Sequence, residues 1–305
     1  MNCSMREDPD PKGRCYVKCS VMTLMFLLLS MTGEGQTRLL SVAQKFAINE
    51  AANGYTMRAN DIQALQHATL DASVNCMDNG NQTSNYISNI VAWWPNIGNS
   101  LTSQSYNLIS PSTNQITWTG TPTANDGYVT LDGSTQWGSV PYNSGFAANS
   151  LTWSCWVNVS SFANTYNSVI EFFDNSFGIA IILKSTGKLA IYLQGSSGNV
   201  FYDGTGSHVL GTSTWYNLIV TYDSATHVLT GYVNALLDAT VTGVLGSPLP
   251  SSIGAKFYIG QTNFPPRLLT GSIQDVMILN GALTSTQVTN TYDWQLNNLG
   301  YANKH

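Results

Sequence analysis

The chain has 305 residues, of which 43% are hydrophobic and only 10% are charged, and its formal net charge is −5. Charged residues usually make up about 25% of a soluble protein, yet residues 91–300 contain only four basic and nine acidic side chains. The apolar content is enough for a core, whereas the missing basic surface argues against DNA or RNA as a partner. The length allows one large all-β domain with an extension, or two ordinary domains.

The first predicted element is the apolar run Val21–Met31, which Arg14 and Lys18 precede. A membrane-spanning helix needs about 20 apolar residues, so the shorter run fits a secretory signal with cleavage between Thr32 and Gln36. We therefore expect residues 1–35 to be a signal-peptide-like segment. The mature protein would then be secreted and extracellular, with no membrane span after cleavage. A retained anchor or a buried hydrophobic stretch is the alternative.

The cysteines divide at this apolar run. Three of them precede it and would be lost on cleavage, and only Cys76 and Cys155 follow. Two cysteines give neither a disulfide framework nor a metal-ligand spacing. Cys155 shares a face of a predicted strand with Trp153 and Val157, which favours a buried free thiol. A Cys76–Cys155 bridge is the alternative.

Residues 36–76 have helical periodicity. An apolar stripe ends at Gly54, and a second helix begins at Asn60 with Gln63 in the capping-box position. These helices either pack on the following domain or form an attachment or homo-oligomerisation segment over 37–76. The composition of residues 77–89 predicts a linker.

From residue 90 the hydrophobic period changes to two, which predicts strands. Turn residues such as Asp-Gly at 132–133 and Thr-Gly at 186–187 separate them. A dozen short strands without long helices between them indicate one β-sandwich or barrel over 90–296, followed by a tail over 297–305. The predicted strands are Ile90–Trp94, Tyr128–Leu131, Trp137–Val140, Leu151–Val159, Ser168–Phe173, Phe177–Lys184, Lys188–Gln194, Val200–Tyr202, Trp215–Tyr222, Val228–Val233, Lys256–Ile259 and Ser272–Leu279.

Five blocks of this region resemble the laminin G-like, concanavalin A-like lectin/glucanase jelly-roll family. They are IVAWWP (90–95), GYVTLDGSTQWGSVP (127–141), NSLTWSCWVNV (149–159), STWYNLIVTYDSATHVLTGYVN (213–234) and the segment 256–292. The resemblance implies an all-β, concanavalin A-like jelly-roll β-sandwich, here with a short N-terminal helical extension.

The last block also predicts a short helix, with Thr284 and Gln287 as its capping box and Val288 and Tyr292 on its apolar face. Two residues depart from the family pattern. Gln274 stands where a second acidic residue is common, and Ala235 stands where a glycine follows the asparagine, which alters only a turn.

The sequence does not predict an enzyme. Jelly-roll glycosidases need two carboxylates on one face of a strand, flanking one glycosidic bond. Glu171 is the one glutamate after residue 90, and Asp174, three residues on, points to the opposite face of a continuous strand. His208 and His227 lie in turn-like contexts without a paired nucleophile.

Calcium is the one cofactor that the resemblance implies, because laminin G-like modules often carry it and it prefers oxygen ligands. Asp132 and Asp223 are the candidate ligands among the acids at loop edges. Because an Asp beside Gly or Ser commonly forms a turn, the alternative is a purely structural role.

Sugar-binding candidates lie in three loops that combine aromatic, amide and hydroxyl groups: 134–145, 161–168 and 260–266. The candidates are Trp137, Tyr142, Tyr166, Asn167, Asn263 and Phe264. Trp137 also matches a position that the family fills with a structural aromatic. The aromatic residues of the strands are predicted to lie in the core instead; they are Trp156, Trp215, Tyr222 and Tyr232.

Two hypotheses of function follow. The first is a non-catalytic, lectin-like adhesion module that binds glycans or glycoproteins on a secreted or surface-exposed protein. The second is a structural subunit of a virion, tail fibre or extracellular filament that displays the jelly roll, with the virion surface as its location. Both can hold together, because a fibre can end in a sugar-binding domain.

Overall fold

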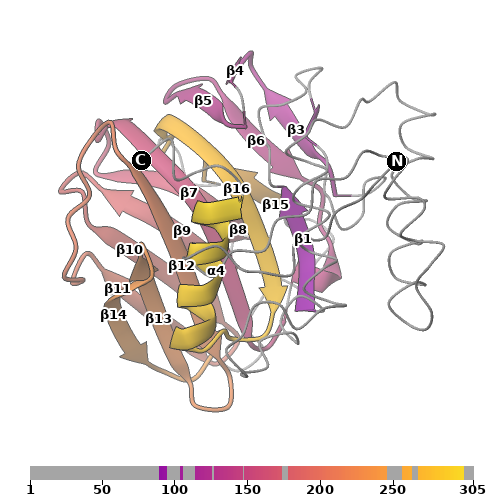
Figure 1. Cartoon of the computed structure of the whole chain (residues 1–305). Coiled ribbons are helices and arrows are strands. Elements are labelled where there is room, and N and C mark those ends of the chain that lie inside the picture. The colour runs from indigo at the N-terminus through magenta and orange to yellow at the C-terminus, as the bar shows by residue number, and fades with distance from the viewer. Residues whose placement is uncertain are drawn as a thin grey trace, which may run out of the picture.

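The computed structural model describes residues 89–94, 104–105, 114–125, 127–146, 148–173, 178–245, 256–262 and 267–298 (Figure 1). The predicted signal-peptide-like segment, the helical extension and Cys76 lie outside the described residues, as do residues 77–88 of the linker and residues 299–305 of the tail. These parts stay predictions. Among the described residues, no helix is long and apolar enough to cross a membrane.

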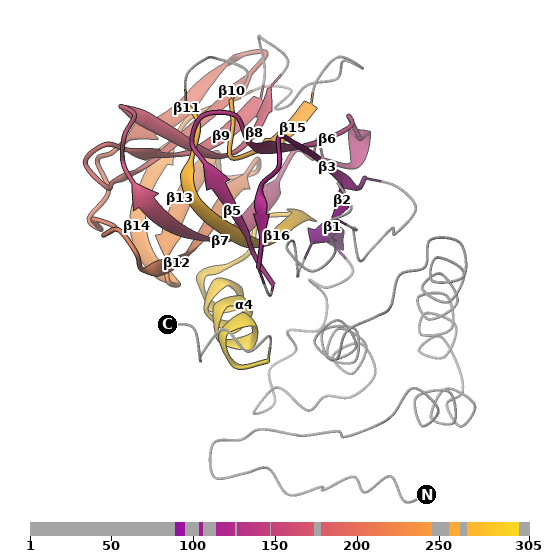
Figure 2. The ribbon, with the colours of Figure 1, turned by 90° about the horizontal axis from the view of Figure 1, so that it is seen from above.

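The described strands form two antiparallel sheets that pack face to face (Figure 2). Sheet A has the order β14 (Leu236–Thr242), β13 (Val228–Val233), β12 (Trp215–Asp223), β7 (Leu151–Ser161), β16 (Thr270–Asn280), β5 (Val129–Asp132) and β4 (Thr123–Ala124), and β1 (Ile90–Trp94) also pairs with β16. Sheet B has the order β11 (Gly198–Asp203), β10 (Leu189–Gly195), β9 (Gly178–Lys184), β8 (Tyr166–Phe173), β15 (Lys256–Ile259), β6 (Trp137–Val140), β3 (Ile116–Thr119) and β2 (Gln104–Ser105). This is the predicted jelly-roll sandwich.

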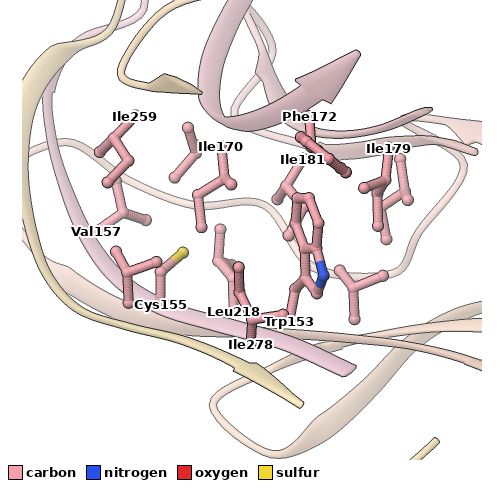
Figure 3. Close-up of a cluster of buried hydrophobic side chains, with 14 of the residues drawn as sticks. Trp153, Cys155, Val157, Ile170, Phe172, Ile179, Ile181, Leu218, Ile259 and Ile278 are labelled. Carbon is pink, nitrogen blue, oxygen red and sulfur yellow. The ribbon is translucent and has the colours of Figure 1, made fainter. Parts of the chain in front are cut away.

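The core lies between the sheets, because alternate residues of each strand point inward. Trp153, Cys155 and Val157 project from the central strand β7 toward Ile170 and Phe172 of β8 (Figure 3). All five side chains are fully buried. Cys155 is also free, as predicted, and burial raises the pKa of its thiol above the usual value, with the charge of Asp275 adding to the shift.

The strand β14 was not predicted, because its burial is the reverse of a normal hydrophobic pattern. Leu236 and Leu237 are 62% and 57% exposed, whereas Asp238 is 7% exposed. Hydrogen bonds offset part of the cost of burying the Asp238 carboxylate, because its Oδ1 accepts from His208 N at 2.7 Å and from His208 Nδ1 at 3.0 Å. Ala235 lies in the turn before β14 with a φ of 62°, as expected for a position that the family fills with glycine. The short strands β2, β3 and β4 were not predicted either.

The C-terminal helix α4 (Ser285–Asn298) covers the outer face of sheet A (Figure 2). Its predicted capping box is present: Thr284 N donates to Gln287 Oε1 at 2.9 Å, and Gln287 N donates to Thr284 Oγ1 at 3.3 Å. The predicted apolar face is also confirmed, since Val288 is buried and the Tyr292 ring stacks on Trp156 at 5.6 Å. The outer face of sheet B is therefore the broad face of the sandwich that α4 leaves uncovered.

Candidate functional site

One end of sheet B brings together three of the loops that the sequence singled out. Because β6 and β8 both pair antiparallel with β15, the starts of β6 and β8 lie beside the end of β15. The connections 134–136 and 162–165 and the described residues after β15, 260–262 and 267–269, therefore meet at this end, which we call the loop end of sheet B. Hydrogen bonds join two of them: Ser168 N donates to Arg267 O at 2.9 Å, and Asn164 Nδ2 donates to Leu268 O at 3.0 Å.

Three aromatic rings lie next to this end on the outer face of sheet B. The rings of Tyr166 and Tyr192 meet edge to face at 6.4 Å, and Tyr192 stacks on Phe201 at 5.6 Å with an interplanar angle of 10°. Phe201 is 50% exposed. We call Tyr166, Tyr192 and Phe201 the aromatic strip. The rings of Tyr166 and Tyr192 pack against a small apolar base that includes the buried side chains of Ile182 and Ala190.

Charged groups surround the first ring of the strip. Lys184 Nζ lies 5.4 Å and Arg267 Cζ 4.8 Å from the centroid of the Tyr166 ring, within the range of cation–π contacts. Lys184 Nζ also pairs with Asp203 Oδ2 at 2.8 Å, and the Tyr166 hydroxyl donates to the same oxygen at 3.4 Å. The hydrogen bond to Asp203 raises the pKa of Lys184. Burial raises the pKa of Tyr192, with further contributions from Tyr166 and Asp203.

Of the predicted sugar contacts, Tyr166 and Trp137 lie on the same face and at the same end of sheet B. Trp137 is half-buried at the start of β6, and β15 separates β6 from β8. Neighbouring strands are about 4.8 Å apart, so β6 and β8 are separated by about 9 to 10 Å. The predicted contacts Asn263 and Phe264 lie outside the described residues, in the loop between Thr262 and Arg267.

Two other candidates have different surroundings. Tyr142 follows the end of β6, so it lies at the opposite end of sheet B, where its ring stacks on Phe172 at 6.0 Å. Asn167 is fully buried, and its side-chain amide donates to the backbone oxygens of Asn164 at 2.8 Å and Leu183 at 3.1 Å. The contacts of Asn167 therefore support the fold of the 162–165 loop.

The candidate calcium ligand Asp132 holds a turn. Its Oδ1 accepts hydrogen bonds from the backbone nitrogens of Ser134, Thr135 and Gln136 at 2.8, 2.8 and 3.1 Å, and its Oδ2 accepts one from Thr135 Oγ1 at 2.6 Å. Partial burial opposes ionisation, but these hydrogen bonds outweigh it and keep the pKa of Asp132 below its usual value.

The second candidate ligand, Asp223, has the same kind of role in the turn between β12 and β13. It accepts hydrogen bonds from Thr226 Oγ1 at 2.7 Å and from Ala225 N at 3.0 Å, and these lower its pKa. Within the described ranges, no group of three or more His, Cys, Asp or Glu side chains could hold a metal ion. Calcium binding stays a prediction, and both carboxylates already serve as turn acceptors.

The outer face of sheet B also carries Glu171. This carboxylate is 1% exposed and lies opposite Tyr258 of β15. Burial and the charge of Glu171 together raise the pKa of Tyr258. Sequence reasoning did not single out Tyr192, Lys184, Asp203 or Arg267 for the site. The pairings of β8 with β9, β9 with β10 and β10 with β11 bring the first three together, and the hydrogen bond from Ser168 N to Arg267 O places the arginine beside them.

Residues 123–289 match the laminin G-type model of the concanavalin A-like lectin/glucanases superfamily. The match covers more than half of the chain, and the chain belongs to this superfamily. A search of curated proteins found no match.

Solved structures with a similar fold include domain 4 of AbnA, an extracellular arabinanase from Geobacillus stearothermophilus, in complex with arabinotriose. This domain is 21% identical with a TM-score of 0.54, and the alignment covers 66% of the present chain and 97% of that domain. The binding domain of botulinum neurotoxin serotype D is 15% identical with a TM-score of 0.53, and the alignment covers 68% of the present chain and 52% of that domain. A Trypanosoma rangeli sialidase is 11% identical with a TM-score of 0.57, and the alignment covers 86% of the present chain and 40% of the sialidase. At these identities the similarity is one of fold, and the present chain spans only about half of the neurotoxin domain.

Proposed function

We propose that this protein is a non-catalytic module, secreted or surface-exposed, that binds glycans or glycoproteins at the loop end of sheet B. The observation that carries the proposal is the aromatic strip beside Lys184, Asp203 and Arg267. Binding sites for small molecules combine apolar and aromatic surface with a few polar groups that fix the orientation of the ligand. Tyr166, Tyr192 and Phe201 supply the aromatic surface here, and the charged side chains supply the polar groups.

The position of these residues on strands also favours recognition. Side chains held by a sheet keep their geometry better than side chains on free loops. Tyr166 lies at the start of β8, Tyr192 in the middle of β10 and Phe201 in β11. A ligand would therefore meet a preorganised surface, which lowers the entropic cost of binding.

The carboxylates of this face support binding in preference to cleavage. A glycosidase needs an acid and a second carboxylate about 5 to 9.5 Å apart with access to the sugar. Among the described residues of the outer face of sheet B, Glu171 is buried, and Asp203 is held by Lys184 and Tyr166. Neither is positioned as an accessible catalytic acid.

The structures of similar fold are consistent with this class of function. The arabinanase domain was solved with arabinotriose, and the binding domain of botulinum neurotoxin DC was solved with rat synaptotagmin II. These ligands belong to those proteins, and the alignment with the neurotoxin domain covers 52% of that chain.

A glycan array probed with the full chain, with and without calcium, tests the proposal. Hits are then measured by calorimetry with wild-type protein, Tyr166→Ala and Tyr166→Phe. We expect Tyr166→Ala to weaken binding about tenfold, which corresponds to about 1.4 kcal/mol, because the variant loses the ring on which the sugar would rest. Tyr166→Phe keeps the ring but loses the hydroxyl, and should have a smaller effect.

Tyr142→Ala is the matched control, because it removes a half-buried tyrosine at the opposite end of the same sheet. Thermal unfolding of each variant shows that it is folded before binding is compared. An array without hits would refute the function. Equal losses in Tyr166→Ala and Tyr142→Ala would refute the location of the site.

A further inference from the structure

We infer that the loop end of sheet B selects acidic glycans, meaning sugars that carry carboxylate or sulfate groups. This inference rests on the proposed function and deepens it by naming the ligand class. It starts from the distribution of charge. Residues 91–300 contain four basic side chains, and three of them, Lys184, Lys188 and Arg267, lie at this one end. The fourth, Lys256, begins β15 at the other end of the sheet.

The two lysines are held side by side on the outer face. Lys184 ends β9, and Lys188 precedes β10 and accepts a backbone hydrogen bond from Lys184 N at 2.9 Å. Gly204 lies against both side chains: a Cβ there would meet Lys184 Cδ at 2.7 Å and Lys188 Cβ at 3.5 Å. Its φ of 70° also favours glycine. The chain thus leaves space for two adjacent lysine side chains at this place.

The acidic groups that the structure describes nearby offset only part of the charge of the two lysines. Asp203 pairs with Lys184 at 2.8 Å. Glu171 is buried in the sheet face, and Asp238 is buried and bound to His208. Lys188 has a different partner, a backbone carbonyl, because its Nζ donates to Gly206 O at 3.0 Å. Among the described residues beside the two lysines, one partly exposed carboxylate, Asp203, therefore stands against two ammonium groups.

These cations should favour an acidic ligand over a neutral one. Covering an ammonium group with a neutral sugar removes water from a charge without supplying an opposite one, and that carries a desolvation cost. A carboxylate or sulfate offsets the cost and forms charge-assisted hydrogen bonds, which are roughly twice as strong as neutral ones. A sugar ring on the aromatic strip would place its acidic substituent near Lys184, whose Nζ lies 5.4 Å from the centroid of the Tyr166 ring and whose neighbour is Lys188.

The test uses an array printed with oligosaccharides in matched pairs, each with and without its carboxylate or sulfate groups, and the full chain as probe. We expect the acidic member of each bound pair to give the stronger signal. Hits confined to neutral members would overturn the inference and leave the proposed function intact. An array without hits would overturn both. Carboxylated and sulfated pairs are scored separately, which distinguishes the two sources of charge.

Calorimetry with dextran sulfate and dextran then locates the charge contact. Lys188→Gln should weaken dextran sulfate binding about twofold to fivefold, as expected for one exposed charge pair. Lys256→Gln removes the same charge from the far end of sheet B and should leave binding unchanged. Binding of dextran sulfate should also weaken as salt is raised, because exposed charges are screened. Equal losses in Lys188→Gln and Lys256→Gln, or equal binding of dextran and dextran sulfate, would overturn the inference.

Discussion

The two outer faces of the sandwich use similar residues for different purposes. On sheet A, Trp156 stacks on Tyr292 and donates from its Nε1 to Gln295 Oε1 at 3.2 Å, and α4 buries this arrangement. On sheet B, Tyr192 and Phe201 stack in the same way, but Phe201 is half exposed. The comparison shows that aromatic stacking with adjacent polar groups does not by itself mark a binding site. What distinguishes the two faces is whether the protein already supplies the covering element.

The face under α4 also contains a buried ionisable group. Asp275 of β16 is fully buried, has a φ of 50° at a register shift of the strand, and accepts a hydrogen bond from Trp93 Nε1 at 2.5 Å. Burial raises its pKa to about 7, although hydrogen bonds from Trp93 and Gln295 oppose the shift. The outer face of sheet B carries both kinds of carboxylate, since Glu171 is buried, whereas Asp203 is partly exposed and pairs with Lys184.

The largest expected difference between the faces is in stability. Trp156→Ala would open a cavity between sheet A and α4 and should lower the free energy of unfolding by about 3 to 5 kcal/mol. Urea denaturation monitored by circular dichroism measures this loss. Gln295→Ala removes the hydrogen bond of Trp156 but keeps the packing of its ring, so it should lower the free energy of unfolding by less than Trp156→Ala does. A loss below about 1 kcal/mol in Trp156→Ala would contradict the structural role of this face.

The second effect is a pH dependence from Asp275. Its folded pKa of about 7 lies above the ordinary value of 3.8, so the folded state binds the proton more tightly. The stability from this group is therefore fully present below about pH 4 and is lost as the pH rises toward and through 7. Between pH 5 and 8 the free energy of unfolding should fall by about 2 kcal/mol, on the basis of about 1.4 kcal/mol per pKa unit.

Asp275→Asn is the control for this dependence. The amide oxygen can still accept the hydrogen bond from Trp93, but the residue no longer titrates, so its unfolding curves at pH 5 and pH 8 should lie closer together. Asp132 and Asp223 do not interfere, because their lowered pKa values confine their effect to pH values below 4. An unchanged pH dependence in Asp275→Asn would contradict the assignment.

The smallest effect on stability is expected on sheet B. Phe201→Ala removes a ring that is 50% exposed, so its free energy of unfolding should change by less than about 1 kcal/mol. Its affinity for an acidic glycan should nevertheless fall about fivefold, if one ring of the aromatic strip contributes about 1 kcal/mol. Leu237→Ala truncates a side chain that is 57% exposed on sheet A and is the matched control. Unchanged affinity in Phe201→Ala would exclude its ring from the binding surface.

Much of the fold could be predicted from the sequence because its signals are local. The strands Ile90–Trp94, Trp137–Val140, Val228–Val233 and Lys256–Ile259 have the predicted bounds, and the capping box of Thr284 and Gln287 begins α4. The aromatic residues assigned to the core are also placed correctly: Trp156, Tyr222 and Tyr232 are buried, and Trp215 packs against the cluster under α4. By contrast, β14 was missed, because a buried Asp238 between exposed residues carries no strand period.

The site could be predicted only in part, because it depends on strand order. Loop composition identified Tyr166 and Trp137, which do lie on one face and at one end. The same criterion also selected Asn167, whose side chain points the other way and is buried. Lys184, Tyr192 and Asp203 come from three further strands, and no local pattern relates them. Their proximity follows from three registers: Tyr166↔Lys184, Ala190↔Ile182 and Ala190↔Asp203.

The burial of Cys155 gives the protein an internal probe of its own opening. A thiol must ionise to react, and this one lies in the central strand β7 with a raised pKa and no exposed surface. Alkylation at this position therefore requires the two sheets to separate, and its rate reports how often they do so. Peptide-resolved mass spectrometry of a time course would separate this cysteine from those before residue 89. The alkylation rate of Cys155 thus measures how often the core opens, and it can be compared with and without bound sugar.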